Sequence, residues 1–202
     1  MSGIIADNVG RASGLVKAAG GGGAWNLIST FTSDGSDATA EFTSGIDSTY
    51  KVYVFDFINI HPETDNVAFT LNFSEDGGSN YLVQKQTACW GWYHSESGGG
   101  ENGGWNRGVP EQTTAYADID GELGNDDDQS ISGRIILYDP SDTTYNHHWI
   151  VNNVCCRYHE NVALGGEGGY TNSDSKAAID AVAFKFSSGE IQGGVIKMYG
   201  VT

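Results

Sequence analysis

Residues 50–81 read YKVYVFDFINIHPETDNVAFTLNFSEDGGSNY, and this stretch decides the fold. In residues 50–60 both alternating rows are rich in aromatic and β-branched side chains, which favours a central strand covered on both faces. Residues 67–74 alternate large apolar residues with small or polar ones, which predicts a strand with one buried and one wet face. A polar turn containing Pro62 separates the two runs. We therefore predict a core hairpin, whose first strand lies in the middle of a sheet.

The remainder of the body, residues 24–202, repeats this pattern of short apolar runs separated by glycine-rich turns. The chain has 29 glycines and 3 prolines, and strong helical periodicity is nearly absent. We count roughly nine or ten such apolar runs, and their spacing along the chain is typical of the strands of an antiparallel sandwich. We predict an all-β fold, an antiparallel β-sandwich of jelly-roll-like type.

Two glycine-rich segments, residues 95–113 and 159–172, read as long loops between these strands. A loop of such length inside a compact domain is often a functional or partner-contacting one. Trp105, followed by Asn106 and Arg107, is the candidate ligand or receptor contact in the first loop. The alternative is that Trp105 folds back over the edge of the core, as large aromatic residues usually do.

Residues 1–23 differ from the body and are predicted to form an N-terminal arm with a glycine hinge. The run Gly20–Gly23 is typical of a flexible joint. An arm too small for its own core either stays mobile or becomes ordered against a partner. The candidate partner-binding residues are its apolar side chains, Ile4, Ile5, Leu15 and Val16.

The charge balance excludes two classes of partner. The formal net charge is −16 and the sequence pI is about 4.3. A chain this acidic does not bind the nucleic-acid backbone by counterion release, and it does not adsorb to an anionic bilayer. It also has no apolar run of about 18 residues and no signal-peptide pattern, so we expect no membrane insertion and synthesis in the cytoplasm of the producing cell.

Cysteine usage favours a reducing compartment. Cys89, Cys155 and Cys156 make an odd set with one adjacent pair, which is not a disulfide framework. A zinc site could use these thiols with the nearby histidines. However, His147 and Cys155 would lie roughly 25 Å apart along an extended strand, so they could share an ion only after a chain reversal.

An acidic segment is a candidate calcium site, because hard oxygen ligands from one loop suit that ion. The spacing matches only the beginning of an EF-hand loop, and the alternative is a solvated turn. No other cofactor is expected. The candidate ligands are Asp118, Asp120, Asp126 and Asp128.

Specific catalytic chemistry is not visible in the sequence. We find no nucleophile elbow, and no pair of carboxylates can be placed at the separation needed for glycoside cleavage. Trp90, Trp92 and Trp105 could form a platform on which sugars stack, or they could pack in the core. We therefore expect a protein that is not an enzyme.

The body contains a set of strand-and-turn motifs: YKVY (50–53) through INIHPETD (58–65), LNFSEDGGS (71–79), FKFSSG (184–189) and GGVIKMYG (193–200). Together these motifs resemble a family of virion structural proteins of tailed bacteriophages. The arm from Ile5 to Leu15 also resembles the opening arm of phage appendage proteins.

This resemblance implies a virion protein of the capsid-decoration, tail or fibre type, acting in particle assembly or host contact. It also implies a homo-oligomer, most plausibly a trimer, that docks on other virion proteins through its arm. A second hypothesis is a carbohydrate-binding module or receptor-binding protein that recognises a host surface glycan. A third is a surface-glycan depolymerase.

Overall fold

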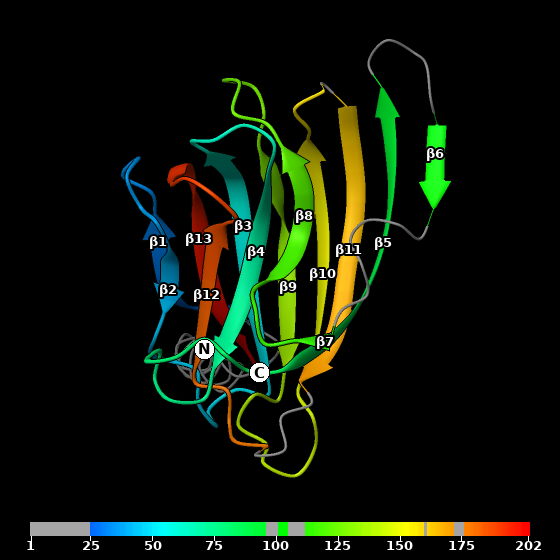
Figure 1. The fold of residues 1–202 in the computed structure, drawn as a ribbon. Coiled ribbons are helices and arrows are strands. Elements are labelled where there is room, and N and C mark those ends of the chain that lie inside the picture. Colours follow the sequence, from blue (N-terminus) through cyan, green and yellow to red (C-terminus); the bar gives the residue numbers. More distant parts are fainter. Residues whose placement is uncertain (1–24, 96–100, 105–111, 160, 172–175) are drawn as a thin grey trace, which may run out of the picture.

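The computed structural model describes residues 25–95, 101–104, 112–159, 161–171 and 176–202, and for residues 101–104 it describes the backbone. These residues form thirteen strands in two antiparallel sheets that pack as a sandwich (Figure 1). They contain no helix that is long and apolar enough to cross a membrane. The predicted all-β antiparallel fold is confirmed, whereas its jelly-roll character stays a prediction.

The two sheets are unequal in size. The strands of the smaller sheet are β2 (Ala40–Phe42), β4 (Val67–Ser74), β8 (Ala117–Leu123) and β12 (Ala181–Phe186), in the order β2–β12–β4–β8. The strands of the larger sheet are β1 (Trp25–Thr32), β3 (Val52–Pro62), β5 (Lys85–Ser95), β6 (Glu101–Gly104), β7 (Gln112–Thr113), β9 (Ile131–Tyr138), β10 (His148–Cys156), β11 (Asn161–Thr171) and β13 (Ile191–Val201). Their order is β1–β13–β3–β9–β10–β11–β5–β6, with β7 paired to β5.

Aromatic side chains between the sheets make the core. On β3, Phe55 and Phe57 point inward and are almost fully buried. The ring centroid of Phe57 lies 5.6 Å from that of Phe69 on β4, and Phe55 lies 5.7 Å from Phe184 on β12. β3 pairs with β13 on one side and β9 on the other, which confirms its predicted place inside a sheet.

The predicted hairpin of residues 50–81 is wrong. β3 belongs to the larger sheet, whereas β4 pairs with β12 and β8 in the smaller one. The register of β3 shifts between Phe57 and Ile60, where Asn59 takes a φ of 49°. The polar turn therefore carries the chain from one sheet to the other. The prediction that both faces of β3 are covered holds at Val54, which is 2% exposed, and fails at Ile58, which lies on the same side and is 43% exposed.

The predicted loop at residues 159–172 is mostly a strand. β11 pairs along its whole length with β10 and with β5. Two of its glycines sit where neighbouring groups leave no room for a side chain: a Cβ at Gly169 would lie 2.2 Å from the carbonyl oxygen of Gln86, and one at Gly166 would lie 2.6 Å from the Trp90 ring. Glycine content here reflects close packing of the sheet, which sequence reasoning mistook for loop flexibility.

The side of β4 that points away from the larger sheet is buried too, whereas the sequence predicted that this side is exposed to water. Asn72 is fully buried, and its side-chain amide donates to the carbonyl oxygens of Tyr81 and Thr114. The ammonium of Lys85, also fully buried, donates to Asn72 Oδ1 at 2.6 Å and to the carbonyl oxygens of Val83 and Ala115 at 3.0 and 2.8 Å. The buried ammonium of Lys85 thus links the irregular segments that contain Val83 and Ala115 to Asn72 of the smaller sheet.

We predict that Lys85→Met lowers the free energy of unfolding by about 3 kcal/mol, because the acceptors around the ammonium lose their donor. Lys51→Met is the matched control: Lys51 forms an exposed pair with Asp139 at 2.8 Å, and such a pair contributes about 0.5 kcal/mol. Urea unfolding of both variants measures the difference. Equal losses would contradict the role of the buried ammonium.

The pH dependence of stability above pH 10 tests the packing of Tyr81, which lies in one of these irregular segments. Burial, followed by the charge of Glu41, raises the pKa of Tyr81 from 10.0 to about 12. The folded state thus holds this proton more tightly than the unfolded chain, so the stabilisation is present below pH 10 and is lost as pH rises from 10 to about 12. Tyr81→Phe should lose less stability than the wild type between pH 9.5 and 11.5, as measured by urea midpoints. Identical pH slopes would refute this assignment.

Candidate interaction face

The outward side of the larger sheet carries most of the exposed apolar side chains. Side chains alternate along a strand, so one row of each strand points away from the sandwich. Of the twelve large hydrophobic residues that are exposed in the described parts of the chain, ten lie on this side. We call it the outer face. The ten are Trp25, Leu27, Ile58, Trp90, Trp92, Tyr138, Ile150, Val154, Val162 and Leu164.

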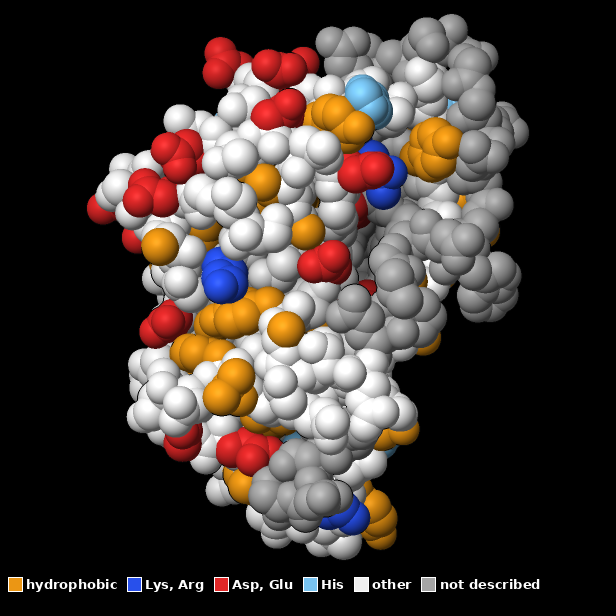
Figure 2. Space-filling view, in the orientation of Figure 1, with side chains coloured by type: hydrophobic (Ala, Val, Ile, Leu, Met, Phe, Trp, Pro, Cys, Tyr) orange, Lys and Arg blue, Asp and Glu red, His pale blue; other side chains and the backbone are white. Residues whose placement is uncertain are grey.

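The outer face is nearly free of charge although the chain is strongly acidic. On the strands with described side chains, only Asp56, Arg134 and Lys197 are charged and point outward, with histidines taken as neutral, which gives this face a formal charge of +1. Figure 2 views the molecule from the opposite side, where acidic side chains gather along the top and one flank. The charge of −16 is therefore carried elsewhere.

Polar residues on the outer face form one row across the strands. Strand register places Thr30 beside Lys197, Lys197 beside Asp56, Asp56 beside Arg134, and Arg134 beside Asn152. We call these five residues the polar row. Mainly apolar rows flank it on both sides. One contains Leu27, Tyr199, Val54, Ile136 and Ile150; the other contains Val195, Ile58, Val154, Leu164 and Trp92, with the polar Ser132 between Ile58 and Val154.

The centre of the polar row is held by an aromatic and ionic cluster. Arg134 makes a two-pronged contact with Asp56, with Nε to Oδ1 at 2.6 Å and Nη2 to Oδ2 at 3.3 Å. The guanidinium carbon lies 4.5 Å from the centroid of the Trp25 ring, and this ring lies 5.4 Å from that of Tyr199. The two-pronged contact and the cation–π contact fix the orientation of Arg134 on the outer face.

Two tryptophans mark the β5 side of the outer face. Trp90 and Trp92 are 36% and 55% exposed, and their ring centroids lie 5.7 Å apart at an interplanar angle of 61°. A Cβ at Gly166 would lie 2.6 Å from the Trp90 ring, so the ring rests against the bare backbone of β11. Both rings face outward, which decides between the two hypotheses for them: they do not pack in the core.

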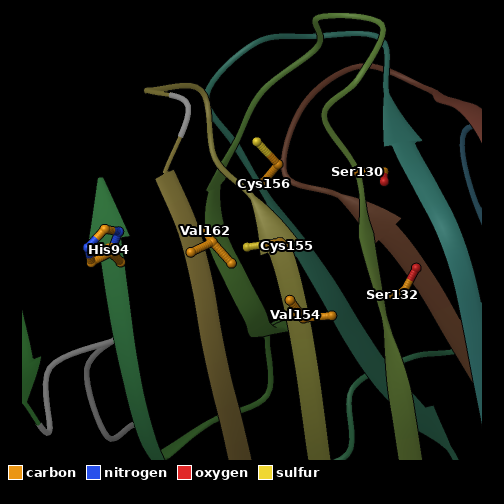
Figure 3. A pocket seen from close by; sticks show the side chains of 7 residues that line it. All are labelled: His94, Ser130, Ser132, Val154, Cys155, Cys156 and Val162. Atoms are coloured by element: carbon orange, nitrogen blue, oxygen red, sulfur yellow. The ribbon is translucent and has the colours of Figure 1, made fainter. Parts of the chain in front are cut away.

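A shallow depression of about 420 Å³ opens at one end of the outer face. Figure 3 shows side chains from four neighbouring strands or their ends around it. His94 on β5 and the hydroxyls of Ser130 and Ser132 are polar, whereas Val154 and Val162 are apolar. Its described lining contains no Asp, Glu, Lys or Arg side chain, so the depression can accept a small uncharged polar group.

Seven of the residues predicted as contacts lie outside the described residues. They are the arm residues Ile4, Ile5, Leu15 and Val16 and the loop residues Trp105, Asn106 and Arg107. Within residues 95–113 the structure adds the short strands β6 and β7, both paired with β5.

The four calcium candidates lie on two elements. Asp118 and Asp120 are on β8, where Asp118 is exposed and Asp120 is buried. Asp120 lies 3.7 Å from the guanidinium of Arg157 and accepts a contact from the Cys155 thiol at 3.3 Å. Asp126 and Asp128 are exposed in the following turn. Among the described residues no group of three or more His, Cys, Asp or Glu could hold a metal ion, and calcium stays a prediction.

The cysteines and histidines considered for zinc point in different directions. Cys155 faces the core toward Asp120, while Cys156 is on the opposite side of β10. His147 is buried, with Nε2 placed 2.8 Å from the carbonyl oxygen of Asp142 and Nδ1 placed 3.1 Å from Thr171 Oγ1. The chain reversal needed to gather them around one ion is not present in the described residues. None of the three cysteines, all of which lie among the described residues, forms a disulfide.

Sequence reasoning missed the outer face, although a signal for it was present. In β9 and β10 both alternating rows contain apolar residues, such as Ile135 and Ile136 or Val151 and Ile150. We interpreted this pattern on β3 as burial on both sides. The smaller sheet covers one side only, so residues of the second row such as Ile58, Ile150 and Val154 are left at the surface.

No protein-family model matches the chain, and no relative was found among curated proteins. The resemblance to phage structural proteins thus stays a prediction that depends on the sequence motifs.

We predict that Gly166→Ala displaces the Trp90 ring and lowers the free energy of unfolding by about 1–3 kcal/mol, because the new methyl group meets the ring and the Val151 carbonyl oxygen at 2.6 Å. Gly168→Ala is the control, since its Cβ would meet nothing closer than 3.4 Å. Near-UV circular dichroism detects the coupling of the two indoles. An unchanged spectrum in Gly166→Ala would show that the ring does not lie there.

Proposed function

We propose that this protein is a structural component of a bacteriophage virion, a capsid-decoration protein or a tail or fibre appendage, that works by assembly and not by catalysis. The observation that carries the proposal is the outer face, which gathers ten of the twelve exposed large hydrophobic residues of the described chain. Contiguous exposed apolar surface on a folded protein is a mark of an interaction site.

The composition of the outer face fits a protein partner. Depletion of charge, with aromatic residues and an arginine near the centre, is the pattern of a protein–protein interface core. Trp25, Trp90 and Trp92 supply rigid apolar area, and Arg134 is held in place by Asp56 and Trp25. These features support assembly into a homo-oligomer and contact with neighbouring virion proteins.

In this proposal the jelly-roll-like body is tethered to the particle by the arm, residues 1–23, through its apolar residues. The protein is made in the host cytoplasm and is then incorporated into the virion. The arm and the outer face have separate tasks: the arm docks on another virion protein, and the outer face mediates assembly between bodies.

Deleting residues 1–19 tests the docking task. We expect incorporation into particles to be abolished, because the arm supplies the contact, while circular dichroism of the purified variant shows a folded β-protein. Particle incorporation is measured by mass spectrometry of purified virions. Normal incorporation of the truncated protein would refute the proposed docking role of the arm. Absence of the full-length protein from particles would refute the proposal that it is a virion component.

A second candidate function is recognition of a host surface glycan. The observation that favours it is the Trp90–Trp92 pair on β5, the strand that also contributes His94 to the depression lined by Ser130 and Ser132. Exposed indole faces offer apolar contact to sugar rings, and hydroxyl and imidazole groups can bond to sugar hydroxyls.

A glycan array decides on this candidate. If glycan recognition is the function, the wild type binds a neutral oligosaccharide and Trp92→Ala lowers the affinity about tenfold or more, whereas Tyr145→Ala, which removes an exposed aromatic residue in a loop, has no effect. Trp105→Ala tests the loop predicted from the sequence in the same assay. No binding by the wild type removes the glycan hypothesis.

A further inference from the structure

We infer that the outer face is covered by the outer face of a second copy of this chain, so that two bodies pair face to face around a twofold axis. The inference rests on the proposed function in one respect, that the outer face is an assembly surface. It adds the identity of the partner and the geometry of the pair.

The size of the outer face suits a stable pair. Seven strands from β1 to β5 at a spacing of about 4.8 Å, and four outward rows about 6.7 Å apart, give a face of roughly 34 by 27 Å, or about 900 Å². Specific interfaces bury about 800 Å² on each partner. One such face on each of two copies is therefore sufficient.

The distribution of charge permits two acidic chains to meet here. Two bodies of −16 repel one another when carboxylates are brought together. On the outer face the only outward carboxylate among the described strand residues is that of Asp56, and Arg134 neutralises it through the contact at 2.6 Å. The outer face is thus a surface through which identical acidic bodies can come into contact without a large electrostatic cost.

The order of the rows makes the outer face complementary to itself. The polar row lies between two apolar rows, so it is near the middle of the face. A twofold axis that lies in the plane of the interface and runs across this row, between Asp56 and Arg134, places the polar row of one copy on that of the other, with Arg134 of each copy opposite Asp56 of its partner. Each apolar row then meets an apolar row. No residue of the polar row is forced against an apolar row of the partner, which is the condition for an isologous interface.

This pairing sets the permitted assemblies. An isologous face joins copies two by two and closes. The protein would be a dimer if the outer face is its only contact. If other surfaces also join it into the predicted trimer, the outer faces would link two trimers into a hexamer. The inference therefore predicts assemblies that contain an even number of copies.

Sedimentation equilibrium of the full-length protein tests the pairing. We expect an even multiple of the 21.5 kDa chain mass at about 100 µM protein. Val154→Lys and Leu164→Lys, each on the outer face, should weaken association at least about tenfold, because each places an ammonium in the interface twice. Since lysine reduces the net negative charge, weaker association cannot result from greater overall repulsion.

Leu82→Lys is the matched control, because Leu82 is 63% exposed but lies outside the outer face; it should associate as the wild type does. Far-UV circular dichroism checks that all three variants fold.

A wild type that stays monomeric, or an assembly whose mass is unchanged in both outer-face variants, overturns the inference. A monomer that binds neutral oligosaccharides would assign the face to a glycan instead. A protein that pairs in solution but is absent from particles would refute the proposed function and leave the pairing intact.

Discussion

The contact of the β3 aromatic residues with the smaller sheet is the constraint on which the structure depends. Phe55 and Phe57 on β3 meet Phe69 and Phe184 from β4 and β12, and these rings close the sandwich. Because β3 uses its inner row for this contact, its outer row and those of β9 and β10 must face away from the core. The position of the core thus determines where the outer face lies.

Sequence pattern was sufficient for the strands and insufficient for their partners. The alternation of Val67 to Ser74 and the β-branched run before Pro62 identified β3 and β4 because side-chain periodicity is local. Which strand pairs with which depends on contacts far apart in the sequence, so a short turn was taken for a hairpin although it joins two sheets. Gly166 and Gly169 were assigned to a loop because the rings and carbonyl groups that fill their side-chain space come from β5 and β10.

The candidate site was only partly foreseeable for a related reason. Trp90 and Trp92 were recognised as candidates, but their exposure depends on which face of the larger sheet the smaller sheet covers. The polar row cannot be read from the sequence at all, since its five residues come from five strands and are aligned only by register. The strong negative charge elsewhere on the chain opposes nonspecific association, whereas the outer face, which carries little charge, permits association at that one surface.

The central claim is that the outer face is covered in the assembled protein. Hydroxyl-radical footprinting tests it most directly, with Trp25 and Trp92 as reporters on the outer face and Tyr145, which is 72% exposed in a loop, as the internal reference. The account predicts that both tryptophans are oxidised in dilute protein and protected in the assembly, while Tyr145 reacts in both. Equal oxidation of the tryptophans in the two states would contradict it.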